Sequence, residues 1–393
     1  MKTYEYKLYR TKKCKHLDNM LREACFVWNH ALALQKRYYS LYKKYINVDK
    51  LQKHFTKRIH RHYMHSQSVQ EVIQRLDASY KRFFKHKAKR PPKFKRHKDF
   101  TSFVFKQGGF IINGNVFHLN SVKKDFRFCY SRKYQGNIKL LRIKRSPKGD
   151  WYIFIVTDAN SEPITKTHNG ASIGIDFGLK TYLTLSNGEK VQNPQFLKHD
   201  LNKLQKLSRA YSKASKSRKE YARRSLASFY EHLSRKRKDW QRMLAHELCR
   251  RYDYIFIEDL RLTGMTKLWG RKMNDLAHGQ FVILLTEIAA RYGCVVHKID
   301  RYYPSSKLCS CGYKNNDLTL QDRKWVCPIC GRTHDRDVLA AANILRRGIY
   351  EMARKSKTNK AISDKAIAEA ASCEGVLATP SLNGSTGHES NAL

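Results

Sequence analysis

Acidic residues are scarce in this chain of 393 residues, which has 33 aspartates and glutamates against 78 lysines and arginines. The resulting formal charge of +45 is self-repelling, so we expect a polyanionic partner, and nucleic acid fits better than a membrane surface. Long apolar runs are also missing, because none approaches the ~18 residues of a transmembrane helix. The N-terminus lacks the apolar segment of a signal peptide. We therefore expect a cytoplasmic protein without membrane segments.

Without a secretion signal, the ten cysteines are expected to be reduced thiols rather than disulfides. Four thiolates close in sequence could hold one structural Zn²⁺ ion, and they are Cys309, Cys311, Cys327 and Cys330. The second pair has the ordinary Cys-x-x-Cys spacing. The first pair is Cys-x-Cys, which strains the usual geometry. The alternatives are a zinc site of altered geometry or lower affinity, and four cysteines without a ligand.

The N-terminal half alternates between strand and helix patterns and ends in a polar linker at 161–169. Alternating apolar residues predict a strand over 2–9, and apolar residues at three- and four-residue steps predict a helix from about Leu17 and another over 66–84. Short strands are expected over 100–160, with a clear hairpin between 140–144 and 151–157.

The C-terminal half follows an α/β order. It starts with a strand ending at Asp176 and a hairpin whose turn is Asn187-Gly188. The segments expected next are two long helices, a strand, a helix and a strand, over about 198–224, 225–250, 254–258, 275–292 and 294–299. This order predicts a ribonuclease-H-like sheet flanked by helices. Residues 355–393 are small and polar, which is typical of a flexible tail.

The two long helices are strongly basic. A solvated helix face is the simpler interpretation, but the sequence suggests that acids do not match these charges at i±4, so the charges repel one another. A phosphate backbone alongside would relieve this repulsion. The candidate nucleic-acid contacts on these helices are Arg223, Arg224, Arg235, Lys236 and Lys238.

Three acids stand where an α/β sheet gathers a site. Asp176 and Glu258 each end an apolar run, and Asp337 opens an Ala-rich helical segment. Singly, they could be a turn former, a surface acid and a helix N-cap. Together they suggest a divalent-metal site for phosphodiester hydrolysis, in which carboxylates hold two metals ~4 Å apart. Glu258 is preferred over Asp259 because it follows the strand alternation, and Asp300 is interpreted as structural.

These motifs, taken in order, resemble the TnpB family, the RNA-guided endonucleases of bacterial and archaeal insertion sequences, related to type V CRISPR effectors. The resemblance covers roughly 1–350 and rests on these segments: Gly-Ile-Asp-Phe-Gly at 174–178, Ile-Glu-Asp-Leu at 257–260, Pro-Ser-Ser-Lys-Leu-Cys at 304–309, Cys-Pro-Ile-Cys-Gly at 327–331 and His-Asp-Arg-Asp at 334–337. It implies that Asp176, Glu258 and Asp337 are the catalytic, Mg²⁺-binding RuvC triad and that the four cysteines bind Zn²⁺. It also implies a monomer with a guide RNA from the element's end, which cuts double-stranded DNA beside a short motif in a prokaryotic, nucleoid-associated setting.

The resemblance also implies a division into domains: a wedge β-barrel (1–14 and 96–165), a helical recognition insert (15–95), a RuvC-like nuclease (166–300 and 334–354) and a zinc-binding insertion (301–333). By similarity to the family, Gln70, Lys106 and Gln107 face the motif duplex. Two departures from the family pattern are the Cys-x-Cys pair and Leu339, which replaces an asparagine. We expect the missing asparagine to weaken support of the metal site.

Two other functions fit parts of the pattern. An RNA-guided DNA-binding protein with weak or no cleavage would share the fold, but the intact set of three acids argues against it. A protein-only ribonuclease-H-like resolvase or transposase would read DNA directly. The absence of a clear helix-turn-helix pattern in the N-terminal half and the large basic excess favour an RNA partner over that alternative.

Overall fold

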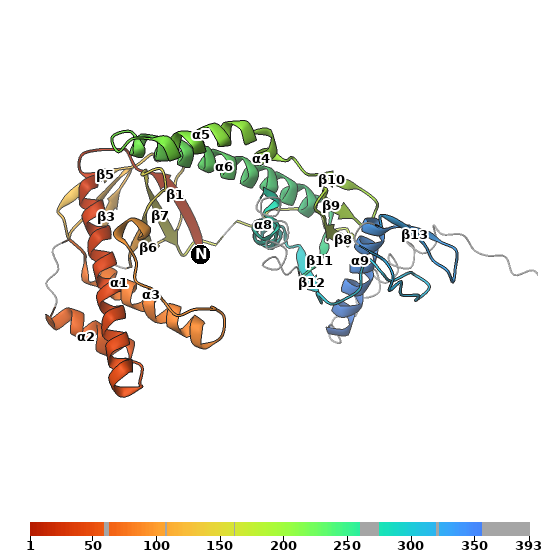
Figure 1. Ribbon diagram of the computed structural model, residues 1–393, viewed down its shortest axis with the longest axis horizontal. Helices are drawn as coiled ribbons and strands as arrows, with labels where there is room; N and C mark the ends of the chain where they lie inside the picture. The colour runs from red at the N-terminus through yellow and green to blue at the C-terminus, as the bar shows by residue number, and fades with distance from the viewer. Residues whose placement is uncertain (59–62, 107, 161, 260–274, 320–321, 356–393) are drawn as a thin grey trace, which may run out of the picture. The chain divides into compact units, whose positions relative to one another are not determined.

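The chain was analysed as a computed structural model, which describes residues 1–393 except 59–62, 107, 161, 260–274, 320–321 and 356–393. It divides into two compact units, one formed by 1–161 with 206–229 and the other by 162–205 with 230–393 (Figure 1). The tail expected over 355–393 lies outside the described residues apart from residue 355. In the described part of the chain, no helix is long and apolar enough to span a bilayer.

Unit 1 contains two antiparallel sheets. Four strands form the first in the order β1-β7-β6-β2, where β1 is Lys2–Lys7, β2 Ser102–Phe105, β6 Ile138–Arg145 and β7 Trp151–Thr157. The second contains β3 (Phe110–Asn113), β4 (Val116–Leu119) and β5 (Lys124–Arg127). An isolated bridge between Leu8 and Phe128 connects the two sheets. The predicted hairpin is therefore confirmed as β6 and β7, whereas a closed barrel is not confirmed.

Three helices pack with these sheets, together with a short 3-10 turn at His97–Asp99. They are α1 (Cys14–Tyr42), α2 (Val48–Arg58) and α3 (Ser66–Phe84). The apolar stripes of α1 and α3 predicted both helices, and their buried residues share one core with the sheets. Sequence reasoning missed α2, which has few apolar residues and buries Leu51 and Phe55.

Unit 2 is built on a five-stranded sheet of order β10-β9-β8-β11-β12. The strands are β8 (Ser172–Phe177), β9 (Thr181–Leu185), β10 (Lys190–Gln192), β11 (Tyr254–Glu258) and β12 (Val295–Ile299). β8, β11 and β12 run parallel, whereas β9 and β10 are antiparallel to their neighbours. The predicted α/β order is confirmed for this unit.

Helices cover both faces of this sheet. Ile173, Ile175, Ile255 and Ile257 point into a core formed with α6 (Lys219–Arg251) and α8 (His278–Tyr292). On the opposite face, α9 (Arg336–Lys355) lies so close to β8 that a Cβ atom added to Gly174 would be 2.1 Å from the carbonyl oxygen of Ala341. Glycines at 174 and 348 thus let α9 pack directly on the strands.

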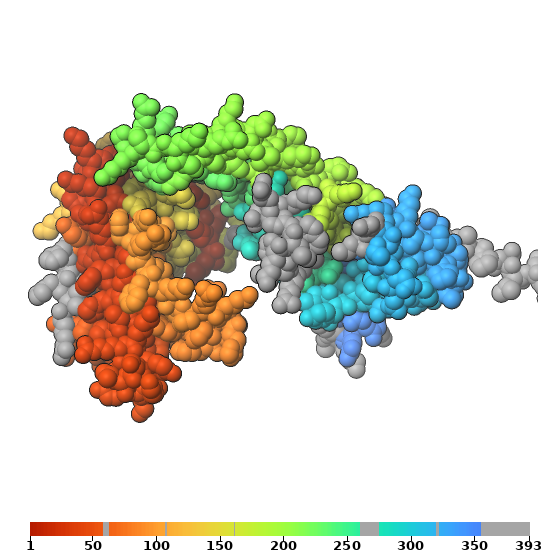
Figure 2. All heavy atoms as spheres, viewed as in Figure 1, coloured from red at the N-terminus to blue at the C-terminus, as the bar shows by residue number. Residues whose placement is uncertain are grey.

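The basic helices begin and end at other residues than predicted. A short α4 (Phe196–His199) precedes α5 (Leu201–Lys213), and α6 begins only at Lys219. The break therefore falls at 214–218, where two serines interact with each other, rather than at 224–225. α5 has no fully buried residue and lies at the surface (Figure 2).

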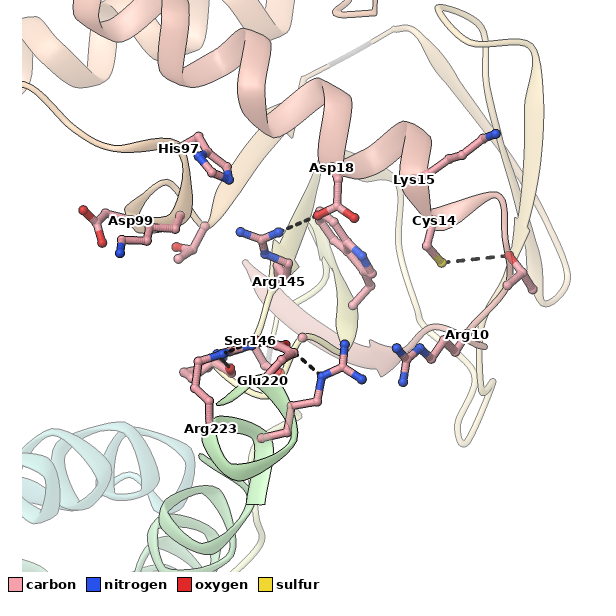
Figure 3. Close-up of a pocket in the computed structure, with 17 residues that line it drawn as sticks. Arg10, Cys14, Lys15, Asp18, His97, Asp99, Arg145, Ser146, Glu220 and Arg223 are labelled. Atoms are coloured by element: carbon pink, nitrogen blue, oxygen red, sulfur yellow. Dashed lines mark hydrogen bonds and ion pairs between the residues drawn. The ribbon is translucent and has the colours of Figure 1, made fainter. Parts of the chain in front are cut away.

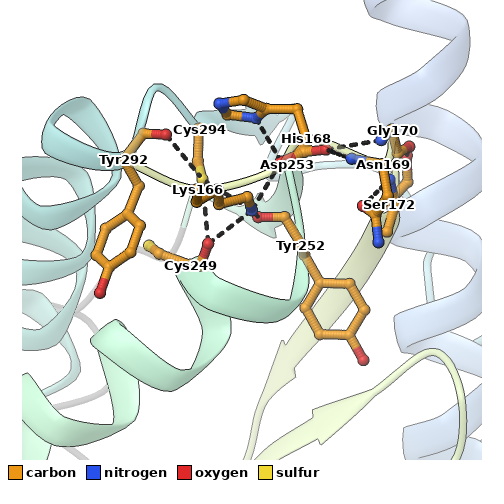
Figure 4. Close-up of polar contacts among 11 residues, drawn as sticks. Lys166, His168, Asn169, Gly170, Ser172, Cys249, Tyr252, Asp253, Tyr292 and Cys294 are labelled. Carbon is orange, nitrogen blue, oxygen red and sulfur yellow. Dashed lines mark hydrogen bonds and ion pairs between the residues drawn. The ribbon is translucent and has the colours of Figure 1, made fainter. Parts of the chain in front are cut away.

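A buried ion pair aligns the starts of β8 and β11 (Figure 4). Lys166 Nζ lies 2.7 Å from Asp253 Oδ1, and the backbone N–H groups of Asn169 and Gly170 donate to Asp253 Oδ2 at 2.9 and 2.7 Å. Burial acts to raise the pKa of Asp253, but the hydrogen bonds from Lys166, Gly170 and His168 hold it below its ordinary value. The clamp fixes the register in which Tyr254 pairs with Ser172.

Candidate active site and nucleic-acid surfaces

The sheet register brings two of the predicted acids together. Ile175 of β8 pairs with Ile257 of β11 in parallel, so the next residues on the two strands, Asp176 and Glu258, lie side by side. Side chains alternate along a strand, so Asp176 is on the same face as Gly174, and Glu258 is on the same face as Phe256. Both of those positions face α9. The two carboxylates therefore lie at the carboxyl ends of parallel strands, on the face covered by α9.

Helix α9 brings the third acid to the same place. Ala341 and Leu345 lie on Gly174, so the first turn of α9, which contains Asp337, reaches toward the end of β8. The N-cap is Asp335, whose Oδ1 accepts hydrogen bonds from the backbone N–H groups of Asp337 and Val338 at 3.0 and 3.2 Å. The alternative interpretation of Asp337 as the N-cap is therefore wrong, and its carboxylate does not cap the helix.

The negative charges of the other two acids act on Asp176. Burial, with the negative charges of Asp337 and Glu258, raises the pKa of Asp176 to about 7, and Arg336 only partly opposes this effect. Burial and the neighbouring Asp259 raise the pKa of Glu258 to about 7. Such shifts mean that the carboxylates lack sufficient positive charge around them, so a cation bound there would be stabilised.

Nearby acids are occupied in other ways. Asp259 forms an ion pair with Arg301, and Asp300 accepts a hydrogen bond from the backbone N–H of Tyr302 in a turn, as its structural interpretation predicted. Asp337 lies 3.4 Å from Arg323. Among the described residues, the oxygens of Asp176, Glu258 and Asp337 do not all come within 4.8 Å of one another, a limit that the four cysteines do meet.

The four predicted cysteines meet despite the Cys-x-Cys spacing. Their sulfurs all lie within 4.8 Å of one another, with Cys309 3.6 Å from Cys330 and Cys311 3.5 Å from Cys327. Burial acts to raise the pKa of the Cys327 thiol, but the backbone N–H groups of Cys330 and Ile329 lower it to about 7. Four converging thiols with an easily ionised member suit a tetrahedral Zn²⁺ site.

Leu339 has a different role from the one expected. It is buried in a small core with two of the cysteines and with Leu318 and Trp325. We expected Leu339 to weaken the metal site because we assumed that a polar side chain at position 339 would support the metal ligands. In the structure the side chain is apolar packing between α9 and the cysteine module, the segment 305–335. The buried amide nearby is Asn343, which sequence reasoning missed.

The basic helices do have acidic partners, which corrects the expectation of unmatched charge. Arg223 and Arg224 both pair with Glu220, at 2.7 and 2.9 Å, and Arg235 pairs with Glu231 at 2.5 Å. Lys236 lies 5.1 Å from the centre of the Phe196 ring, and Lys238 is exposed. The repulsion argument for these five residues is therefore weakened.

A basic pocket of about 820 Å³ in unit 1 is a second candidate surface (Figure 3). Arg145 pairs with Asp18 at 2.5 Å on one wall, and Arg223 donates to the carbonyl of Pro147 on another. The charged lining has six basic and three acidic residues, which are Arg10, Lys15, Lys98, Arg145, Arg223, Arg224, Asp18, Asp99 and Glu220. The surplus of positive charge could bind phosphate groups.

The predicted motif-reading residues border a stripe of glutamines on α3. Gln70 is exposed, and Lys106 Nζ donates to Gln74 Oε1 at 2.7 Å. Gln67 Oε1 accepts from the backbone N–H of Gly108 at 3.1 Å. Gln67 and Gln74 were missed, although their spacing of three and four residues from Gln70 places all three on one helix face. Gln107 lies outside the described residues.

Comparisons with known proteins agree with this geometry. The model of the "Probable transposase" family matches residues 154–268, which include Asp176 and Glu258. The "Cas12f1-like, TNB domain" model matches 278–344, which include the four cysteines and Asp337.

Relatives that match most of the chain are also found. A "Putative RNA-guided DNA endonuclease" of Streptomyces pristinaespiralis is 30% identical over 288 residues, covering 72% of this chain and 71% of the relative. The "Putative RNA-guided DNA endonuclease InsQ" of Escherichia coli K12 is 27% identical and covers 83% and 87%. A match to a solved Cas12f1-sgRNA-target DNA complex covers 87% of this chain and 98% of the Cas12f1 chain, at 14% identity and a TM-score of 0.35. This similarity is too low to support a structural conclusion.

Proposed function

The chain belongs to the TnpB family of RNA-guided DNA endonucleases, and on this premise we propose that Asp176, Glu258 and Asp337 are its catalytic carboxylates. The observation that supports this proposal is the placement of the three acids at one sheet end under α9, where burial and the charges of Asp337 and Glu258 raise the pKa of Asp176 to about 7. The sheet order and strand directions support a ribonuclease-H-like, RuvC-type fold, for which we propose a site at this end of the sheet.

The donor set fits Mg²⁺, which prefers carboxylate oxygens and water. One or two such ions would stabilise the attacking and leaving oxygens of a phosphodiester when bound. The protein's own residues position the three carboxylates, and one residue favours the ionised form of Asp176. β8 and β11 hold Asp176 and Glu258 in register, Asp335 caps the helix that carries Asp337, and Arg336 lowers the pKa of Asp176 toward ionisation.

The cysteine cluster is proposed to hold one structural Zn²⁺. Four sulfurs within 4.8 Å of one another fit its coordination, and a site with four protein thiolates keeps no position for water or substrate. The ion would therefore stabilise the cysteine module rather than take part in chemistry.

The partners proposed are a guide RNA and double-stranded DNA with a short adjacent motif. Unit 1 supplies the basic pocket and the glutamine stripe, which suit phosphate binding and base reading, respectively. We also propose the finer division into a wedge domain, recognition insert, nuclease and zinc insertion, with a protein monomer per RNA. The structure assigns 206–229 to the first unit, which the division from sequence placed in the nuclease.

The decisive experiment compares single alanine variants with a matched acid. Asp176→Ala, Glu258→Ala and Asp337→Ala should each abolish cleavage of a matched target, while co-purified RNA and target binding stay unchanged. Asp259→Ala removes a neighbouring acid that pairs with Arg301, and it should keep most of the cleavage. Normal cleavage by any of the three variants would remove that residue from the site.

One assay identifies both the guide RNA and the adjacent DNA motif. The RNA that co-purifies with the protein is sequenced, and a target matching its variable end is placed beside a randomised flank. Cleavage at a subset of flanks supports RNA-guided cutting. Binding without cutting by the intact protein would favour an RNA-guided repressor, and cutting without RNA would favour a resolvase or transposase.

A further inference from the structure

Helix α9 is joined to the cysteine module by polar and apolar contacts at several points. The module contains a hairpin of β13 (Lys324–Val326) and β14 (Thr333–Asp335), and β14 runs directly into α9. One turn into α9, Leu339 packs in the core of the module. A turn further, the buried Asn343 donates from Nδ2 to the carbonyls of Ser305 and Leu308 at 2.6 and 2.7 Å. These contacts fasten the middle of α9 to the loop before Cys309.

Several contacts hold the start of α9: Lys190 pairs with Asp335 at 2.8 Å, and Arg336 donates to the Thr319 carbonyl at 2.9 Å. His334 adds a contact with the cysteine cluster itself. Its Nε2 lies 3.1 Å from the sulfur of Cys309, and its ring packs on Trp325 with the centroids 4.7 Å apart. His334 stands immediately before Asp335, the N-cap of α9, and three residues before Asp337. It is therefore the direct contact between the buried end of the cysteine cluster and the segment that carries the third proposed catalytic acid.

We infer that His334 is a positioning residue that transmits the state of the cysteine cluster to Asp337. With Zn²⁺ held, the thiolate of Cys309 accepts a hydrogen bond from Nε2–H of His334, which fixes β14 and the first turn of α9. This inference rests on the proposed function of Asp337. It makes the zinc ion a determinant of active-site geometry, in addition to a stabiliser of the module.

A donor role fits His334 better than a ligand role. The four sulfurs form the group whose atoms all approach one another within 4.8 Å, and His334 is not a member of that group among the described residues. Groups that hydrogen-bond to metal ligands orient those ligands, and losing one typically lowers metal affinity or activity by about 10–100-fold.

The hairpin is too small to hold this arrangement alone. β13 and β14 pair over only three residues each, from Lys324 with Asp335 to Val326 with Thr333. An isolated two-stranded hairpin is marginally stable in water. Without a filled cluster, the chain before Asp337 would lose the His334 contact and keep only the pairing of Asp335 with Lys190 and the contacts of Arg336. The middle of α9 would keep its packing on β8 through Ala341 and Leu345.

Two substitutions separate the hydrogen bond from the ring. His334→Phe keeps an aromatic ring on Trp325 but removes the donor, whereas His334→Gln keeps an N–H donor and removes the ring. His246→Phe is the matched control, because His246 is a half-buried histidine that contacts Tyr292 in the core on the opposite face of the sheet. Zinc content, amide hydrogen exchange over 333–345 and target cleavage are measured for each protein.

We expect His334→Phe to keep about one zinc ion per chain, while exchange at 335–340 rises about tenfold and cleavage falls by about 10–100-fold. His334→Gln and His246→Phe should stay close to the original protein, and zinc removal should raise exchange in the same segment. Unchanged exchange after either zinc removal or His334→Phe would overturn the inference, and so would zinc loss in His334→Phe, because the side chain would then hold the cluster rather than transmit its state. If Asp337→Ala still cuts DNA, the proposed function of Asp337 fails. The hydrogen-exchange result still tests whether His334 couples the cysteine cluster to the first turn of α9.

Discussion

Gly174 of β8 and Ala341 of α9 are in direct backbone contact, because a Cβ atom at position 174 would lie 2.1 Å from the Ala341 carbonyl oxygen and 2.7 Å from the Leu345 nitrogen. Real Cβ atoms essentially never come within 3.0 Å of such atoms. The glycine of the Gly-Ile-Asp-Phe-Gly motif is therefore needed for helix packing. Its contact sets how closely the helix of Asp337 approaches the strand of Asp176.

Gly174→Ala should consequently move α9 away from the sheet and separate the two acids. Overpacking of this kind typically lowers the free energy of unfolding by ~1–3 kcal/mol, and we expect cleavage to fall more steeply than stability. Gly108→Ala is the control for stability, because its added carbon would meet only the Gln67 side chain at 3.9 Å or beyond. Chemical denaturation and cleavage rates measure both effects, and full cleavage by Gly174→Ala would contradict the role given to this contact.

The raised pKa values of Asp176 and Glu258, both about 7, predict how pH acts on stability and metal binding. Between about pH 4 and 7 the folded state holds protons that the unfolded state has released, so these groups stabilise the fold at low pH and lose that effect as pH rises through 7. Mg²⁺ competes with the protons, so adding it should raise the melting temperature more at pH 8 than at pH 5. Asp176→Asn should flatten this difference. An equal Mg²⁺ effect at both pH values would argue against a metal at these acids.

Asp253→Ala should unfold unit 2 more readily, because it leaves the buried Lys166 ammonium without its partner and removes the clamp at the start of β8 and β11. Breaking a buried ion pair by removing one partner costs about 3–5 kcal/mol. Asp125→Ala is the matched control: its carboxylate pairs with His118 at an exposed site, and it should change stability by less than about 1 kcal/mol. Denaturant titration checks both variants.

Gln70→Ala should change which flanking motif supports cleavage. Gln70 is exposed on the glutamine stripe of α3, and a glutamine amide can pair with adenine through two hydrogen bonds worth ~1–3 kcal/mol in discrimination. Gln67→Ala is the informative comparison, because the Gln67 side chain accepts a hydrogen bond from the backbone of Gly108. We expect this variant to lower stability and to leave the motif preference unchanged. The randomised-flank assay measures the motif preference of both variants. Unchanged preference in Gln70→Ala would place recognition elsewhere in the N-terminal half or in the RNA.

Removing a positive charge from the basic pocket should weaken RNA binding. It should also make the affinity for RNA less dependent on salt. If Arg10 or Lys15 neutralises one phosphate, its replacement by alanine should reduce the slope of log affinity against log salt by about 0.7–0.9. Lys124→Ala removes an exposed cation of β5 outside the pocket and serves as the comparison. An unchanged slope in both pocket variants would show that RNA phosphates do not bind there.

The sequence predicted the nuclease sheet well because its signals are local. Apolar runs ending at Asp176 and Glu258 marked β8 and β11, and helical periodicity marked α3 to the residue. It could not show that Gly174 and Gly348 seat α9, because that contact joins segments distant in sequence. The N-cap role, which the sequence offered as an alternative for Asp337, belongs to Asp335, because the helix begins two residues earlier than that alternative required.

Charge partners were harder to predict for a related reason. A count of basic residues along α6 hides Glu220, which pairs with two arginines from one helical position. The apolar role of Leu339 likewise depends on the core of the cysteine module, which forms from residues on either side of it in the chain. The apolar patterns that mark elements were therefore readable, whereas the partner of an individual side chain was not, even where it lies on the same helix.

The order in which the two units share the chain has a consequence for biosynthesis. Residues 206–229 belong to the unit that begins at Met1, although residues 162–205 of the other unit come between them. A ribosome must therefore translate through residue 229 before the first unit has all of its parts, and the second unit must wait for α9, which ends at Lys355. Domains generally fold as units during synthesis. A nascent chain of this protein can therefore complete its first unit while Asp337 on α9 has yet to be made, so the proposed set of three acids is completed last.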